Sequence, residues 1–177
     1  DVILNTINGD SNIAFFEDLH RAGITPDKLP VMSFSIAETE LSTMNRAYVA
    51  GHYAAWNYFQ SINREENRAF LSRLHEAYGT SRVAADPMEA AYVGVHLWAL
   101  AVKDAHSIET EAVRRALGDQ SFPAPQGVVY VDPETQHTWK MVRVGRIRSD
   151  AQFDIVWESG KPVRPAPYPP YRSRAEW

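Results

Sequence analysis

The chain has 177 residues, of which 45% are apolar, with 18 basic and 22 acidic side chains and a formal net charge of −4. This length corresponds to roughly one domain of about 100–200 residues and is sufficient to bury one core. The composition excludes disordered and collagen-like proteins, and the nearly balanced charge gives no electrostatic basis for binding nucleic acid or an anionic membrane. The lack of cysteine excludes disulfide scaffolds, thiol catalysis and cysteine-ligated zinc.

The chain opens in the middle of a structural pattern. Residues 2–7 are typical of a strand already under way, and neither a leading turn nor a signal-peptide pattern precedes them. No apolar run approaches the about 18 residues that span a bilayer. We therefore expect the sequence to be the C-terminal part of a longer protein, cut just upstream of a buried strand.

The first 60 residues alternate between strand and helix patterns. Short β-rich runs predict strands over residues 2–7, 30–34 and 48–55. Helical spacing of apolar residues predicts a helix from Ser11 that ends at Gly23, and the segment Ser35 to Glu38 has capping-box spacing for a second helix. Strands alternating with helices favour a parallel α/β layer with right-handed crossovers.

The middle of the chain is predicted to be helical. One helix follows residue 63 and ends at Gly79, a longer one opens with Pro87 at its first turn, and a third stops at Gly118. In the longest helix, 3.6-residue spacing predicts an apolar face made of Met88, Ala91, Tyr92, Val95, Trp98, Ala99 and Val102.

The last part returns to period-two patterning. The runs over 127–131, 138–147 and 153–157 predict an antiparallel meander. Beyond it, residues 161–177 are so rich in proline that they predict an extended tail.

No recognisable catalytic or metal motif occurs. The six histidines never form a ligand pair, and phosphate-binding loops and nucleophile elbows are absent from the sequence. We therefore expect no enzyme activity, no cofactor and no metal.

Two loops are candidates for ligand binding because ligands of parallel α/β sheets bind outside the carboxyl ends of the strands. The first loop holds Asn8, Gly9, Asp10 and Ser11, and the second runs from Ser35 to Glu38. Each has a structural alternative: a turn capped by Asp10 or Ser11, and a capping box between Ser35 and Glu38. A third group, comprising Tyr53, Trp56, Tyr58 and Phe59, fits core packing or ligand stacking.

Three segments closely resemble one family: NTINGDSN at 5–12, PVMSFSIAETEL at 30–41 and GHYAAWNYF at 51–59. The resemblance continues through APQG at 124–127 and PVRPAPYP at 162–169. It is to the C-terminal half of the urea and short-chain amide substrate-binding proteins of ABC transporters. These are type I periplasmic binding proteins of the branched-chain amino acid group. A cytoplasmic relative, the amide-sensing regulator of an amidase operon, shares part of the pattern.

The resemblance implies an incomplete α/β fold of two lobes that close on ligand like a hinge. It assigns residues 1–58 to the second lobe, 59–123 to helices of the first lobe, 124–160 to a return to the second lobe, and 161–177 to the tail. It further implies ligand-binding roles in the cleft for Asn8, Gly9, Asp10, Ser11, Ser35, Glu38 and Tyr53.

Urea offers four N–H donors and one acceptor, so its site needs several acceptors, such as Asp10, Glu38 and the Asn8 amide oxygen. The resulting hypothesis is a periplasmic or surface-tethered solute-binding component that binds urea or a short amide noncovalently and docks on a membrane permease. The alternative hypothesis is a cytoplasmic amide-sensing regulator. Because residues 62–122 would expose apolar surface in a half-protein, a homodimer is also expected.

Overall fold

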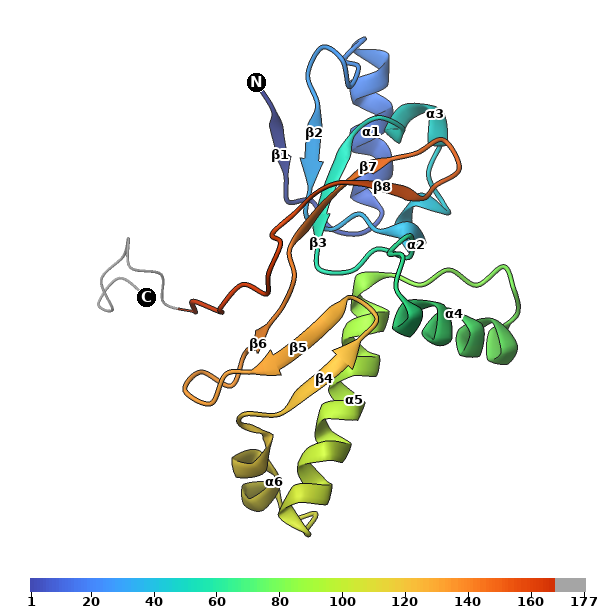
Figure 1. The fold of residues 1–177 in the computed structure, drawn as a ribbon. Coiled ribbons are helices and arrows are strands. Elements are labelled where there is room, and N and C mark those ends of the chain that lie inside the picture. Colours follow the sequence, from blue (N-terminus) through green and yellow to red (C-terminus); the bar gives the residue numbers. More distant parts are fainter. Residues whose placement is uncertain (168–177) are drawn as a thin grey trace.

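The structure, a computed structural model, describes residues 1–167 and contains two sheets joined at a narrow junction (Figure 1). Sheet A has five strands in the order β1-β2-β3-β7-β8. They are β1 (Ile3–Asn5), β2 (Val31–Ser33), β3 (Tyr53–Trp56), β7 (Arg143–Ile147) and β8 (Phe153–Glu158). Sheet B has three antiparallel strands, which are β4 (Ser121–Ala124), β5 (Gly127–Val131) and β6 (Thr138–Trp139).

Sheet A begins with the predicted parallel layer. Strands β1, β2 and β3 pair in parallel, with Asn5 opposite Ser33 and Ser33 opposite Ala54. Strands β7 and β8 then extend the sheet in the antiparallel direction. The helices of this part are α1 (Ser11–Arg21), α2 (Glu38–Leu41) and α3 (Arg46–Val49). The α/β fold with a mixed sheet therefore agrees with the sequence prediction.

The main core lies between sheet A and its helices. Phe16 of α1, Val31 of β2 and Phe153 of β8 are at most 1% exposed and belong to one contiguous apolar cluster. His52 is buried among them, where its Nδ1 accepts a hydrogen bond from the Val31 N–H at 3.0 Å. The core therefore fixes the strand ends from which the candidate loops emerge.

The third predicted strand is shorter than the sequence indicated. Tyr48 belongs to α3, whose start is capped by Asn45 through a 3.1 Å hydrogen bond from the Ala47 N–H. The chain then turns at Gly51, whose φ of +94° disfavours other residues. Only the residues from Tyr53 onward form the strand β3. The cap and the turn together explain why the apolar run from 48 to 55 is not one strand.

The second part is built around a long helix. The helices α4 (Glu65–Tyr78), α5 (Asp86–Ala105) and α6 (Thr110–Leu117) have the predicted order and endpoints. The buried face of α5 differs from the prediction, because Val93 and Leu97 pack against sheet B while Val95 and Trp98 are more than half exposed. Helix α5 is apolar on both faces, so its periodicity does not reveal which face is covered.

Sheet B packs on α5 and is connected to sheet A by short segments. The run from 138 to 147 is divided between the two sheets: β6 pairs with β5, and β7 pairs with β3. The expected single meander is therefore two antiparallel units, and the chain returns to sheet A at residues 140–142 rather than at 124. In the described part of the tail, Val163 donates its N–H to the Lys140 carbonyl at 2.8 Å. The rest of the predicted tail, 168–177, lies outside the described residues.

Candidate functional site

The carboxyl ends of β1 and β2 are tied together by polar side chains. The Asn5 Nδ2 donates to Asn12 Oδ1 at 2.8 Å and to Ser33 Oγ at 3.1 Å, and its Oδ1 accepts the Ile7 N–H at 2.9 Å. The Asn12 Nδ2 in turn donates to the Ile7 carbonyl at 2.8 Å. These buried bonds hold the loop after β1 in a fixed shape, so the residues at its tip are presented to solvent.

The tip of this loop contains four of the predicted site residues. Asn8, Gly9, Asp10 and Ser11 are all exposed, and Gly9 has a φ of +66°. Asp10 stands at the N-cap position of α1, but its side chain makes no capping hydrogen bond. The carboxylate of Asp10 is therefore not used by the helix, contrary to the capping interpretation.

The second predicted loop lies directly beside the first. The Ser35 hydroxyl donates to the Ile7 carbonyl, and the Trp56 Nε1 donates to the Ile36 carbonyl at 2.7 Å. A hollow of about 200 Å³ lies between the first loop and α2, and its lining includes Gly9, Asp10, Thr39 and Glu40 but no residue from Ser35 to Glu38. The structure thus brings Gly9, Asp10 and the start of α2 together at one edge of sheet A.

Glu38 and Tyr53 lie away from this hollow. Glu38 is 1% exposed, and its Oε1 accepts the Gln60 N–H at 2.7 Å. The predicted capping box of Ser35 with Glu38 does not form, because Glu40 instead accepts the Ala37 N–H at 2.9 Å. Tyr53 begins β3, opposite Met32 and Arg146, and so sits back from the carboxyl ends of the strands. Of the other aromatic residues, Tyr58 and Phe59 are fully buried in the core.

A buried polar cluster at the junction of the two sheets was not predicted. Arg143 donates to the Asn57 carbonyl at 2.6 Å and to the Gln126 carbonyl at 2.8 Å. Its Nε lies 3.4 Å from the Glu158 carboxylate, an ion pair without hydrogen-bond geometry. The Asn57 Nδ2 also donates to the Met141 carbonyl at 2.6 Å. One arginine and one asparagine thus bind the two connecting segments, 57–64 and 140–142, to the β4–β5 turn.

Two carboxylates from the first turn of α5 complete this junction. Asp86 accepts the backbone N–H groups of Asn57 and Tyr58 at 3.1 and 2.8 Å. Glu89 accepts the Gln126 Nε2 at 2.8 Å. Both side chains lie on the buried face of α5. The sequence held a signal for this burial, since positions 86, 89, 93 and 97 share one helical face. Acidic residues in a first helical turn, however, are usually explained by their favourable interaction with the helix dipole.

Burial controls the electrostatics of the junction. Desolvation raises the pKa of Glu38 from 4.5 to about 7, and the charges of Asp86 and Glu40 add to that rise. Desolvation also raises the pKa values of Asp86 and Glu89, against the hydrogen bonds that favour their charged forms. The pKa of the Tyr58 hydroxyl is raised by burial and by the three carboxylates around it.

A larger hollow of about 460 Å³ lies beside the junction and is lined in part by Arg64, Gln126, Arg143 and Glu158. The Asp10 carboxylate at the edge of sheet A offers acceptors for N–H donors, whereas the larger hollow presents the donors of Arg64 and Arg143 beside the oxygens of Gln126 and Glu158. Within residues 1–167, no group of three or more histidine, aspartate or glutamate side chains is placed to hold a metal ion. No helix among these residues is long and apolar enough to cross a membrane.

The family described as periplasmic binding protein domain matches residues 1–174. A curated protein named limonene hydroxylase, from Geobacillus stearothermophilus, is 33% identical over 124 residues, which are 70% of this chain and 23% of that protein.

Solved structures match nearly the whole chain. A solute-binding protein of an ABC transporter from Rhodopseudomonas palustris BisB5, in complex with 3,4-dihydroxybenzoic acid, has a TM-score of 0.80 at 16% identity, covering 93% of this chain and 46% of that one. An amino acid ABC transporter substrate-binding protein from Pseudomonas fluorescens Pf-5 has a TM-score of 0.81 at 15% identity, with 93% and 45% covered. A leucine-binding protein from Thermotoga maritima MSB8 has a TM-score of 0.71 at 17% identity, with 89% and 44% covered. The chain thus spans less than half the length of each of these proteins.

Proposed function

The chain belongs to the periplasmic binding protein domain family, with the type I α/β fold, and we propose that it forms one side of the ligand cleft of an ABC importer's solute-binding component. The observation that carries this proposal is the edge of sheet A. There, hydrogen bonds join the loops after β1 and β2, the first loop presents exposed polar groups beside a hollow that α2 also lines, and Glu38 at the end of the second loop accepts the N–H of Gln60 in the connecting segment. Two parts joined by short segments at such an edge are the arrangement that hinge closure around a ligand requires.

For the ligand, we propose urea or a short-chain amide. The Asp10 carboxylate is the exposed acceptor that lines the hollow, and Asn8 is exposed two positions earlier in the same loop. A molecule with several N–H donors and one oxygen would pair with these acceptors and leave few polar groups unsatisfied. Ser35 and the backbone at Gly9 are the proposed neighbouring contacts, and Ser11 lies at the rim of the loop. Glu38 and Tyr53 act from further back, as supports for the loops.

The wider setting follows from the same proposal. A solute-binding component of this kind works outside the cytoplasm and delivers its ligand to a membrane permease. Binding is noncovalent, so the ligand is released unchanged.

Calorimetric titration tests the proposal directly. Urea and acetamide are titrated into this chain and into the longer protein if its gene encodes one, and leucine and 4-hydroxybenzoate are titrated in parallel. Because this chain is proposed to form one side of the cleft, micromolar binding of urea or acetamide is expected for the longer protein, and much weaker binding for this chain alone. Exclusive binding of leucine or 4-hydroxybenzoate would overturn the amide assignment but retain the cleft, whereas no binding of any of the four would overturn both.

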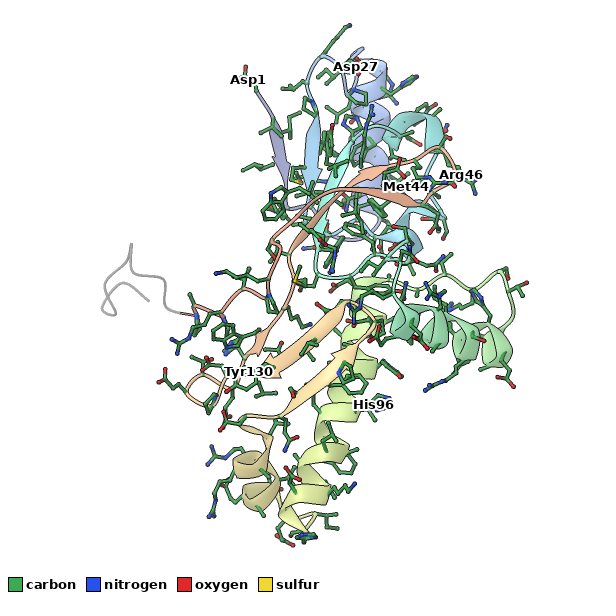
Figure 2. All side chains as sticks on the ribbon, in the orientation of Figure 1. Asp1, Asp27, Met44, Arg46, His96 and Tyr130 are labelled. Atoms are coloured by element: carbon green, nitrogen blue, oxygen red, sulfur yellow. The ribbon has the colours of Figure 1, made fainter. Side chains whose placement is uncertain are left out.

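A matched pair of variants then locates the site. Asp10→Asn turns a carboxylate acceptor into a mixed donor and acceptor, and it should weaken binding of the amide about 10-fold or more. Asp27→Asn is the control, because Asp27 is exposed at the end of this part that faces away from the junction (Figure 2). Equal affinity in wild type and Asp10→Asn would place the ligand elsewhere.

A further inference from the structure

Glu38 has one satisfied and one unsatisfied carboxyl oxygen. Its Oε1 accepts the Gln60 N–H at 2.7 Å, while its Oε2 is buried without a hydrogen-bond partner. The side chain is 1% exposed, so water does not compensate in this state. An ionised carboxylate in this position would therefore leave part of its charge unpaired in the protein interior.

Gln60 connects Glu38 to several other segments. The Gln60 Oε1 accepts the Ala84 N–H at 2.6 Å, just before α5, and its Nε2 donates to Gln152 Oε1 at 3.2 Å. The Gln60 carbonyl accepts from Asn67 Nδ2 of α4 at 3.0 Å. The bond between Glu38 and Gln60 is thus the point at which the loop after β2 is attached to the second part of the molecule.

The groups around Glu38 do not neutralise a negative charge. Glu40, on its own helix, and Asp86, on α5, both repel it, and Tyr58 presents a buried neutral hydroxyl. The backbone N–H groups of Gln60 and of Glu38 itself are the donors that favour the ionised form. Two states therefore satisfy the carboxyl: a protonated one that stays buried, and an ionised one that separates from Gln60 and admits water.

We propose that Glu38 is a proton-operated latch that holds the loop after β2 against the connecting segment 57–60 when protonated and releases it when ionised. The latch does not depend on which ligand binds, because the unpaired Oε2 of Glu38 and the bond from Gln60 to its Oε1 are features of the chain itself. It extends the proposed function by making the geometry of the cleft edge depend on pH. The pKa of about 7 means that the buried carboxyl loses its proton near neutrality.

Hydrogen exchange of the Gln60 amide reports the latch directly, and it is measured without ligand on the same chain. With a pKa of about 7 when buried and 4.5 when released, the opening equilibrium should rise roughly 70-fold between pH 5 and pH 8, after correction for intrinsic exchange. The reference is the Val131 amide of sheet B, which donates to the Gln120 carbonyl at 2.8 Å and has no carboxylate partner. Its corrected exchange should change far less.

Two variants isolate the carboxyl. In Glu38→Gln the side chain stays neutral, so the corrected exchange of Gln60 should lose its pH dependence. In Glu17→Gln, on the exposed side of α1, it should match wild type. The latch is refuted if Gln60 and Val131 in wild type change equally with pH, or if Glu38→Gln retains the dependence. If Glu38→Gln does not fold, the wild-type comparison of the two amides still decides. A failure of urea or acetamide to bind would refute the ligand proposal but leave this result unchanged.

Discussion

Replacing Glu38 by glutamine should raise the stability of the folded chain by an amount that depends on pH. Burial raises the pKa of Glu38 from 4.5 to about 7. Because the folded chain binds the proton more tightly than the unfolded chain, wild-type stability is full below about pH 4.5 and falls as the pH rises to 7. The difference between 4.5 and about 7, at about 1.4 kcal/mol per pH unit, corresponds to ~3 kcal/mol. Glutamine has the shape of the neutral acid and avoids this loss.

Denaturation by guanidinium chloride measures this difference, and urea is avoided because it is a proposed ligand. The free energy of unfolding is compared between wild type and Glu38→Gln at about pH 4 and about pH 8.5. The two proteins should be nearly equal at the lower pH. At the higher pH, Glu38→Gln should be more stable by up to ~3 kcal/mol, since release of the ionised side chain in wild type relieves part of the cost of burial. Glu17→Gln, an exposed control, should follow wild type at both. A gain of equal size at both pH values would show that shape or packing, not ionisation, sets the effect, and would refute the reasoning.

Three further substitutions test the core and the junction by the same denaturation assay. Arg143→Met should destabilise the chain by about 3–5 kcal/mol, because the carbonyls of Asn57 and Gln126 lose a charged donor. A loss below about 1 kcal/mol would contradict the conclusion that Arg143 holds the connecting segments together. Gly145→Ala would place a Cβ 2.8 Å from Phe59 Cζ and should cost about 1–3 kcal/mol, whereas an unchanged free energy would show that the sheet can shift there. His52→Leu leaves the Val31 N–H without its acceptor and should cost about 1–3 kcal/mol above pH 7. Burial lowers the pKa of His52, so wild type should lose stability as the pH falls below about 6.5, and this loss should be absent from the leucine variant.

The parts of the fold that depend on local rules were predictable from the sequence. Helices α1 and α4 end near Gly23 and Gly79, whose φ values are +68° and +89°, because glycine adopts such conformations without strain. The parallel order of β1, β2 and β3 followed from the alternation of strand and helix patterns. The candidate loops followed in turn, because the end of a parallel strand determines which residues reach the edge of the sheet.

The choice of a buried face on α5 could not be made in the same way. Val93 and Leu97 are buried, while Val95 and Trp98 are 65% and 53% exposed, although all four are apolar. A helix with apolar residues on both sides has no strong preference in its own sequence. The packing of sheet B determines which face of α5 is buried, and the sequence did not predict the pairing of β4 with β5 that forms this sheet. For the same reason, the sequence did not show that Asp86 and Glu89 lie on the buried face.

The junction is the part that local patterns cannot reveal. Its bonds join residues far apart in the sequence, since Asn57 contacts Met141 and Arg143, 84 and 86 positions away. Period-two patterning runs through 138–147 without a break, yet the chain changes sheets within it. A buried arginine or glutamate in such a run resembles an ordinary solvent-facing residue until its partners are known. Candidate ligand-binding loops can therefore be predicted from strand ends, whereas residues that join two parts of a molecule become visible only when both parts are in place.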